Sequence, residues 1–330
     1  MNRSLQRLKL GIAIEGFLQY KTAEALSAAT LYAHKDHLTV FANHIGEREV
    51  QNIPTADLRA YLAWMRSDYK PRRLGGSTAP LSSKTLRNIW VSLSAFFRWA
   101  STEFHFENPM KGVPAPKFKY PPVEAFTKEE IERLLKACEY SREAKTDARR
   151  KFVMRRPTAN RDRALILMLV DTGLRAGELC SLQVGDLEQA TGKVHVKHGR
   201  AGGAKGGKGR FVYLGKAARR AVWRYLAERE DGRDPEAPLF IGKFNRTLKR
   251  DVLLKLIERA GQRAGIGHCH PHRFRHTFAI TYLRSGGDLF TLQALLGHRS
   301  LEMVQHYARI AQVDVQDAHR RASPADNWRL

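Results

Sequence analysis

The chain has 330 residues, of which 43% are hydrophobic, and this is enough for two ordinary domains with packed cores. Its 57 Lys and Arg against 33 Asp and Glu give a formal net charge of +24, which predicts a polyanionic partner, nucleic acid before an anionic membrane surface. The longest apolar run, residues 164–170, is too short to span a bilayer, and the weakly apolar N-terminus excludes a secretory signal. Three widely spaced cysteines exclude a disulfide framework and are typical of a reducing cytoplasm.

The first hundred residues carry apolar side chains at helical spacing. Residues 30–46, 54–65 and 82–100 each predict an amphipathic helix, and a basic loop rich in Gly, Pro and Ser at 70–83 precedes the third. The stripe of the third helix consists of Leu86, Ile89, Trp90, Leu93 and Phe97. Such a stripe is typical of a side that packs into a core.

A segment rich in proline then divides the chain. Residues 107–126 contain five prolines, which stiffen the backbone and block helix formation. Thr127 and Glu130 next have the spacing of a capping box, which predicts that a helix begins there. The expected boundaries are 1–107 for the first domain, 108–123 for the linker and 124–330 for the second domain, with a C-terminal tail at about 311–330.

The second domain is expected to mix helices with a short strand region. Residues 163–170 are mostly apolar on all sides, which predicts a buried helix. Residues 193–198 and 210–214 alternate like two strands around a Gly/Lys loop at 199–209, and the pattern is helical from 216 onward. The predicted fold class is therefore mainly α: an all-helical N-terminal domain and an α+β C-terminal domain with a small antiparallel sheet.

The stretch GHCHPHRFRHTF holds four histidines and a cysteine and raises the question of a metal site. Three of these residues, His268 to His270, are consecutive, and consecutive residues do not converge on one ion. His272 and His276 have i,i+4 spacing, but no glutamate follows His272 as the zinc motif HExxH requires. We therefore expect no metal.

The same stretch fits phosphate chemistry better. Pro271 is a favoured first residue of a helix, which would put His272 and Arg275 on one face. Arginine presents a planar fork of donors that matches phosphate oxygens, and histidine gives or takes a proton near neutrality. An HxxR pair also arises by chance.

Further cationic residues stand in two other segments. Arg175 and Glu178 follow the predicted buried helix within TGLRAGEL, where an ordinary surface salt bridge is the alternative interpretation. Lys205 lies in the Gly/Lys loop, where an ammonium with a lowered pKa could protonate a leaving oxygen. The alternative, a basic loop that only touches a DNA backbone, fits Lys208 and Arg210.

Two more candidates lie near the end of the chain. His298 follows Gly297 at a turn, and Tyr307 lies on a helix that we expect to begin at Ser300. A phenol is a poor nucleophile unless cations stabilise its anion, and Arg175, Arg275 and Lys205 together would do so. The alternative for Tyr307 is simple packing.

In this order, TGLRAGEL, AKGGKGRFVYL, HPHRFRHTF, LLGHRSLEM and HYARI resemble the motifs of the tyrosine recombinases: phage-type integrases, Xer-type resolvases and related mobile-element enzymes. The resemblance covers nearly the whole chain, and the N-terminal helices look like the SAM-like core-binding domain of that family. It assigns Tyr307 as the nucleophile and Arg175, Lys205, His272, Arg275 and His298 as the other catalytic residues. Glu178 and His276 match supporting positions. The hairpin loop is longer and richer in glycine than the family's common form, so Lys208 stays open as the alternative to Lys205.

The resemblance also implies a reaction and partners. A member of this family cleaves and rejoins duplex DNA through a 3′-phosphotyrosyl intermediate, with no cofactor, metal or ATP. The expected assembly is a dimer on each DNA site and a homo-tetramer on two sites, with the C-terminal tail passed between subunits. The expected location is cytoplasmic, at the nucleoid and away from membranes, and whether a directionality factor also binds stays open.

The expected biological role is integration and excision, or transposition, of a mobile element, although the motifs themselves do not distinguish these events from dimer resolution. The alternatives are an Xer-type dimer resolvase, a type IB topoisomerase-like nicking enzyme, a metal-dependent nuclease, and a DNA-binding protein without catalysis.

Overall fold

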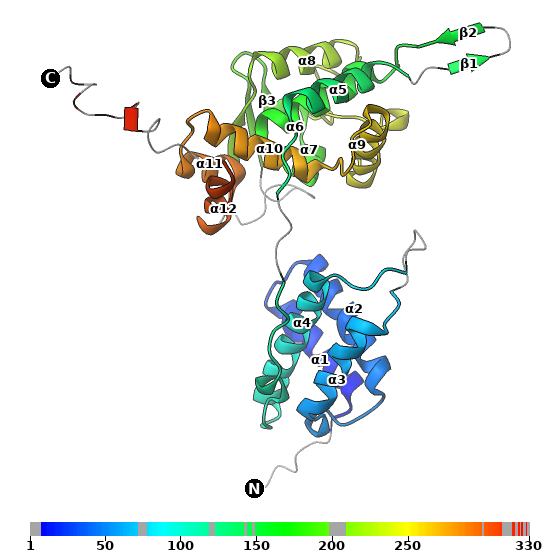
Figure 1. Ribbon diagram of the computed structural model, residues 1–330, viewed down its shortest axis with the longest axis vertical. Coiled ribbons are helices and arrows are strands. Elements are labelled where there is room, and N and C mark those ends of the chain that lie inside the picture. The colour runs from blue at the N-terminus through cyan, green and yellow to red at the C-terminus, as the bar shows by residue number, and fades with distance from the viewer. Residues whose placement is uncertain are drawn as a thin grey trace. The chain divides into compact units, whose positions relative to one another are not determined.

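The computed structural model forms two compact units, Met1–Pro121 and Pro122–Leu330. The residues it describes are 8–71, 78–118, 123–141, 144–146, 149–197, 209–298, 300–311, 319–320, 323, 325 and 328. The chain is mainly helical with a small antiparallel sheet in the second unit, and this confirms the fold class predicted from the sequence. Figure 1 shows both units.

The first unit is a helical bundle. Its elements are α1 (Leu10–Ala23), α2 (Ala28–Ile45), η1 (Val50–Asn52), α3 (Thr55–Ser67), α4 (Ser83–Glu103) and η2 (Pro109–Gly112). Serine side chains define two of the helix starts, because Ser27 accepts from the backbone N–H of Thr30 and Ser82 from that of Thr85.

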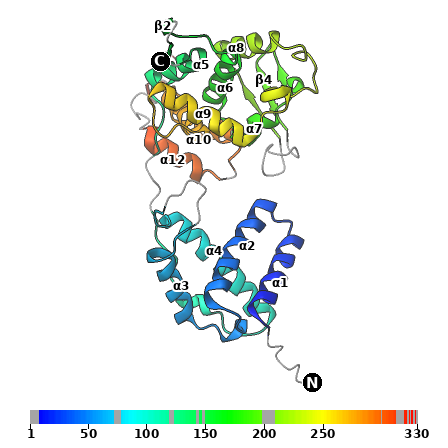
Figure 2. The same cartoon turned by 90° about the vertical axis from the view of Figure 1, so that its right-hand side faces the viewer.

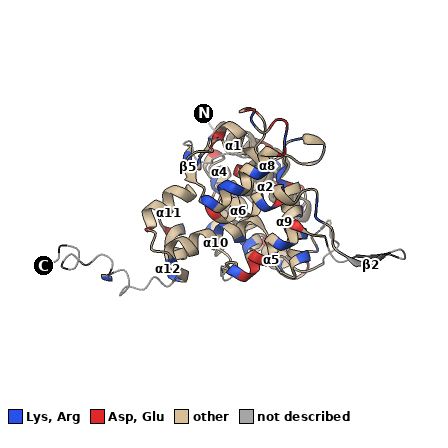
Figure 3. Ribbon diagram, turned by 90° about the horizontal axis from the view of Figure 1, so that it is seen from above, with Lys and Arg blue, Asp and Glu red and all other residues tan. Residues whose placement is uncertain are grey.

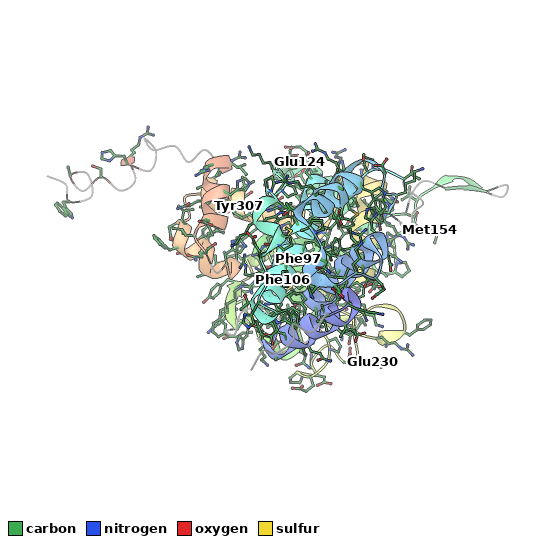
Figure 4. The ribbon with its side chains drawn as sticks, turned by 90° about the horizontal axis from the view of Figure 1, so that it is seen from below. Phe97, Phe106, Glu124, Met154, Glu230 and Tyr307 are labelled. Atoms are coloured by element: carbon green, nitrogen blue, oxygen red, sulfur yellow. The ribbon has the colours of Figure 1, made fainter. Side chains whose placement is uncertain are left out.

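Aromatic rings fill the core of this unit. Phe97 on α4 contacts Phe41 of α2 and its neighbour Phe96 edge to face, and Phe96 contacts Phe17 of α1 in the same way. Edge-to-face contacts add to the hydrophobic gain from burial, so this cluster holds the helices together. Figure 4 labels Phe97 within the first unit.

Part of the proline-bearing segment also packs onto the first unit. Met110 and Val113 are buried in the same core. The indole N–H of Trp90 donates to the carbonyl of Val113 at 3.1 Å, and the hydroxyl of Thr55 donates to that of Pro109 at 2.9 Å. The backbone through residue 113 is therefore held by α3 and α4.

The second unit contains the sheet and the remaining helices. In chain order these are α5 (Lys128–Glu139), β1 (Ala144–Thr146), β2 (Arg149–Phe152), α6 (Ala159–Thr172), α7 (Ala176–Ser181), η3 (Val184–Asp186), β3 (Leu187–Glu188), β4 (Lys193–Val196), β5 (Arg210–Tyr213), α8 (Lys216–Ala227), η4 (Lys243–Asn245), α9 (Arg250–Ala264), α10 (Pro271–Arg284), α11 (Leu289–Leu296) and α12 (Glu302–Ala311). The expected capping box starts α5: Thr127 accepts from the N–H of Glu130, and the carboxylate of Glu130 accepts from that of Thr127.

Helix α6 is the centre of the second unit. It packs against α5, α8 and α10, so its apolar residues are buried on several sides, as the sequence predicts. Figures 1 and 2 show α6 surrounded by these helices. It ends at Gly173, whose φ of +61° is a left-handed cap that turns the chain toward α7. A buried helix with a fixed end gives the residues after it a rigid support.

The sheet has the order β3-β4-β5 and is antiparallel. Val194 and Val196 of β4 and Val212 of β5 point into the core, while Phe211 and Tyr213 are exposed on the other face. β4 and β5 are the two predicted strands, and the short β3 joins them. A second pair, β1 and β2, forms a separate hairpin that extends from the helices in Figure 1. The sequence did not predict this hairpin, because its charged residues lack apolar alternation.

Helices α10, α11 and α12 share a smaller core. Leu283, Leu292, Leu296 and Val304 are buried in it together with Tyr307 of α12. α12 begins at Glu302, two residues later than the expected Ser300. Packing of α12 against α10 and α11 therefore fixes where the Tyr307 side chain lies.

Lys and Arg residues recur over the elements of both units, and acidic residues occur at places such as the first turn of α5 (Figure 3). Within the described ranges, no helix combines the length and apolar character needed to cross a membrane.

We predict that Phe97→Ala lowers the free energy of unfolding of the first unit by about 3–5 kcal/mol, because it leaves a cavity among fully buried rings. Urea unfolding followed by tryptophan fluorescence measures this, since Trp90 and Trp99 lie on the same helix. The matched control is Val91→Ala on α4, whose side chain is 46% exposed and whose loss should cost less than about 1 kcal/mol. Equal losses from the two variants would contradict the packing described.

Candidate active site

The histidine-rich stretch gives each of its members a different environment. His268 is exposed, Cys269 is buried against Gly261, and His270 caps α10 by accepting from the backbone N–H of Arg273 at 3.2 Å. α10 begins at Pro271, as the sequence predicts. In the part of the chain that the structure describes, no group of three or more His, Cys, Asp or Glu side chains could hold a metal ion.

Arg275 is the most deeply buried of the candidate cationic residues that the structure describes, with 1% of its surface exposed. One Nη donates to the carbonyl of Gly173 at 2.8 Å, and the other donates to that of Leu296 at 2.7 Å. Burial, and then the nearby charge of Arg175, lower the pKa of Arg275 to about 9, so the guanidinium stays protonated at neutral pH.

His298 lies against Arg275 with its Nε2 2.7 Å from an Arg275 Nη. An arginine can only donate, so Nε2 of His298 must accept, and the proton of the neutral ring is on Nδ1. Burial, and then the charges of Arg275 and Arg175, lower the pKa of His298 to about 3, so the ring is neutral at pH 7. Nδ1 is buried and has no partner among the described residues. It is therefore a donor available to an incoming oxygen.

Arg175 forms the third cationic position and is tied to Glu178. Its Nη1 donates to Oε1 of Glu178 at 2.8 Å, and its backbone N–H donates to Oε2 at 2.9 Å. Its Nη2 lies 3.4 Å from the carbonyl of Gly297. The side chain is 32% exposed, so this is a half-buried pair and not the ordinary surface salt bridge considered as the alternative. The Arg175 side chain therefore remains partly exposed to solvent.

Glu178 binds a second arginine that the sequence did not assign to the site. Arg210, the first residue of β5, donates from Nη1 and Nη2 to the two carboxylate oxygens at 2.9 and 2.8 Å. Burial opposes the charge of Glu178, but the bonds and charges of Arg210 and then Arg175 outweigh it, so its pKa is lowered. The alternative interpretation offered for Arg210, a loop residue that only touches a DNA backbone, does not describe this side chain, which is 11% exposed and bound to Glu178.

Tyr307 completes the cluster from α12. It is 5% exposed, its ring stacks at 13° to that of His298, and Figure 4 labels it on its helix. Its hydroxyl lies 2.9 Å from Nδ1 of His276, one turn beyond the N-terminus of α10. Burial raises the pKa of the Tyr307 phenol, and the charges of Arg275 and Arg175 oppose this rise.

The two histidines of α10 have different environments: His276 contacts Tyr307, and His272 is exposed. His276, which the sequence marked as supporting, is the one that bonds to Tyr307, and burial and then His272 lower its pKa to about 4. His272 lies at the exposed edge, with its ring 4.3 Å from that of His276 in an edge-to-face contact. Its i,i+4 spacing to His276 was the signal in the sequence that could have identified this pairing.

The candidate hairpin lysines, Lys205 and Lys208, lie outside the described residues. The strands on either side are described: β4 ends at Val196 and β5 begins at Arg210. The loop that carries the lysines therefore returns to the sheet at a residue that contacts Glu178.

Comparisons with known proteins agree with this architecture. The model of the phage integrase family matches residues 124–313, more than half of the chain, and that of the phage integrase N-terminal SAM-like domain matches residues 14–103. Tyrosine recombinase XerC of Oceanobacillus iheyensis is 28% identical over 97% of this chain and 98% of its own length. XerC of Escherichia coli O157:H7 is 29% identical over 90% of this chain and 91% of its own.

Solved structures have the same fold. The Tn1549 transposon integrase in complex with a circular intermediate DNA superimposes with a TM-score of 0.71 at 17% identity, covering 91% of this chain and 94% of that one. XerH site-specific recombinase bound to palindromic difH substrate gives a TM-score of 0.67 at 21% identity over 99% of this chain and 100% of that one.

The buried histidines predict how stability depends on pH. His276 and His298 have pKa values of about 4 and about 3 in the folded chain, below the ordinary 6.5. The unfolded chain therefore binds protons first as the pH falls. We expect the free energy of unfolding to keep its full contribution from these two histidines above about pH 6.5 and to decrease as the pH falls toward 4.

Urea midpoints of the wild type and His276→Gln at pH 7.5, 5.5 and 4.5 check this prediction. The variant should lose less stability over the acidic range than the wild type. His268→Asn removes an exposed imidazole at a left-handed backbone position that Asn tolerates, and it is the control for losing one histidine. An unchanged pH slope in His276→Gln would contradict the neutral, buried state of this ring.

Proposed function

Because the chain belongs to the phage integrase family, and is by that membership a tyrosine site-specific recombinase, we propose that it cleaves and rejoins duplex DNA through a covalent link to Tyr307. The observation that carries the proposal is the convergence of Tyr307, Arg275 and His298 on one place in the second unit. Arg175 joins them through the carbonyl of Gly297. A phenol beside two arginines fits nucleophilic attack on a phosphodiester.

The chemical step needs no energy source beyond the DNA itself. The Tyr307 oxygen attacks phosphorus, an O–P bond forms, and the bond from phosphorus to the 5′-oxygen breaks. The product is a 3′-phosphotyrosine and a 5′-hydroxyl. A 5′-hydroxyl from a partner strand can reverse the step, and this completes strand exchange. The same number of phosphoester bonds is present before and after, so the step needs no ATP. The positive charges of Arg175 and Arg275 are assigned the part that metal ions take in many nucleases.

The arginines and His298 are assigned to the phosphate oxygens. The remaining N–H groups of Arg275 and of the partly exposed Arg175 donate to the non-bridging oxygens, where negative charge grows in the transition state. The free Nδ1–H of His298 donates to the same group. These donors are held by backbone carbonyls before DNA arrives, so little reorganisation is needed during the reaction.

The proton of the tyrosine is assigned to the histidines of α10. We assign Nδ1 of His276 as the acceptor of the hydrogen bond from the Tyr307 hydroxyl, 2.9 Å away, and the low pKa of His276 keeps its ring neutral at pH 7. His272, which the family motif assigns to this role and to phosphate binding, contacts His276 and faces solvent. Lys205 is assigned to the other end of the reaction, where it protonates the leaving 5′-oxygen.

DNA binding is assigned to both units. The net charge of +24 favours contacts with many phosphates. Among proteins of the same fold, lambda integrase is described as a dimer bound to a core site, and this supports a dimer on each site here. We extend this to a homo-tetramer on two sites, acting at the nucleoid, with the tail at about 311–330 reaching a neighbouring subunit. Trp328 in that tail is 72% exposed.

The proposed biological event is the integration and excision, or transposition, of a mobile element, with or without a directionality factor. The fold shared with a transposon integrase supports it. The second candidate is an Xer-type dimer resolvase, which the relatives named tyrosine recombinase XerC favour because they match along almost the whole chain.

We predict that the wild-type protein forms a covalent adduct with DNA in the presence of EDTA and that Tyr307→Phe does not, because phenylalanine lacks the attacking oxygen. Sheared chromosomal DNA of the source organism and DNA from either side of the gene are the substrates. Adducts are separated on a denaturing gel, and sequencing of the DNA bound to the protein identifies the cleaved site.

Tyr282→Phe is the matched control, since it removes a hydroxyl from α10 outside the cluster. Adducts that persist in Tyr307→Phe would move the nucleophile to another tyrosine. DNA binding on a native gel without an adduct from any fragment would favour the non-catalytic DNA-binding protein instead. Adducts that need a divalent metal would contradict the metal-free chemistry.

We also predict that Lys205→Ala slows adduct formation by about 10²-fold or more, because the 5′-oxygen then leaves without a proton. Replacing that bridging oxygen with sulfur should restore the rate, since a thiolate leaves without protonation. Single-turnover cleavage of the two substrates by Lys205→Ala and Lys208→Ala measures the difference. Restoration by sulfur in Lys208→Ala alone would assign the acid to Lys208.

A further inference from the structure

Arg210 connects three segments of the second unit that carry different parts of the cluster. Its Nη atoms hold both carboxylate oxygens of Glu178 on α7, and its Nε donates to the carbonyl of Leu295 on α11 at 2.7 Å. Arg210 itself begins β5, directly after the Gly/Lys loop. One side chain therefore connects the β4–β5 hairpin, the turn that carries Arg175 and the end of α11, the helix that leads to His298.

The turn at Gly297 is shaped around this side chain. Gly297 has a φ of +64°, and a Cβ placed there would lie 3.2 to 3.3 Å from the Cδ, Nε and Nη1 of Arg210. A larger residue would both strain the backbone and press on the guanidinium. The close approach brings the carbonyl of Gly297 to Arg175 and sets His298 beside Arg275.

The charges give Arg210 a second effect. Glu178 is 1% exposed and accepts from Arg175 and Arg210 together, so one negative charge is shared between two positive ones. Without Arg210, the carboxylate would be paired with Arg175 alone. Its charge would then offset that of Arg175, and a phosphate would meet a weaker field there.

We propose that Arg210 is a positioning residue for the recombination reaction: by neutralising Glu178 it leaves the charge of Arg175 for the scissile phosphate, and by binding Leu295 it holds the turn that places His298. This inference rests on the proposed function. Arg210 acts through Glu178, Arg175 and His298, and it needs no contact with DNA.

The test compares Arg210→Ala, Arg210→Lys, Glu178→Gln and the double variant Arg210→Ala/Glu178→Gln. The substrate is the DNA fragment that the wild type converts to an adduct, and the readouts are the first-order rate of adduct formation at saturating protein and the DNA affinity on a native gel. Arg233→Ala, which removes an exposed arginine from a loop of the same unit, controls for the change in net charge. Circular dichroism confirms that every variant is folded at the assay temperature.

We expect Arg210→Ala to slow cleavage by about 100-fold while DNA affinity changes by less than about threefold, because phosphate contacts elsewhere supply most of the binding. Arg210→Lys keeps the positive charge but loses the contact of two Nη atoms with the carboxylate. Its cleavage rate should therefore lie between those of the wild type and Arg210→Ala, about tenfold below the wild type. The double variant removes the unbalanced carboxylate as well and should cleave at least about tenfold faster than Arg210→Ala.

The gain in the double variant is the decisive result, since a side chain that only packs would not be rescued in rate by neutralising Glu178 in protein that is already folded. The inference would be overturned if Arg210→Ala cleaved DNA at the wild-type rate, or if the double variant cleaved it no faster than Arg210→Ala. A wild type that forms no adduct would instead refute the proposed function, and the inference would fall with it.

Discussion

The site depends on keeping positive charge inside the protein, and the ends of two helices make this possible. Burying a guanidinium removes its hydration, and neighbouring cations add to the cost. Arg275 is stabilised by the carbonyls of Gly173 and Leu296, which stand at the C-termini of α6 and α11. Those carbonyls have no partner within their own helices and carry the negative end of the helix dipole. Both helices end in a left-handed glycine, so the chain turns away and leaves the carbonyls facing the arginine.

The rest of the second unit serves to hold those two helix ends in place. α6 is buried on several sides, so its C-terminus has a fixed position, and α10 packs against it while carrying Arg275 and His276. α12 packs against α10 and α11 and brings Tyr307 to His276. The small sheet contributes one more cation, Arg210, at the point where the hairpin returns. Elements far apart in the sequence thus meet through packing of ordinary apolar faces.

Local signals in the sequence predicted much of this arrangement. The capping box at Thr127, the helix start at Pro271 and the buried α6 all follow from short-range physical rules, and the structure confirms them. The role of Arg210 could not be predicted, because a cation beside a Gly/Lys loop is more often exposed, and only the tertiary fold brings Glu178 to it. The His276 contact was missed for a similar reason: the spacing emphasised His272, but which imidazole faces α12 depends on how the two helices pack. β1 and β2 lack the alternation that reveals strands.

The glycines at two turns, Gly173 and Gly297, matter when the sequence of a related gene is used to judge whether its product is active. At Gly173 an added Cβ would lie 2.6 Å from a ring carbon of Phe278, and at Gly297 it would press on Arg210. Either change would displace a carbonyl that holds an arginine, while every charged residue, histidine and tyrosine of the cluster stayed in the sequence. An inventory of the reactive side chains alone would therefore accept a degenerate gene copy as functional. Whether Gly173 and Gly297 are kept therefore indicates whether the reactive side chains can still take up their positions.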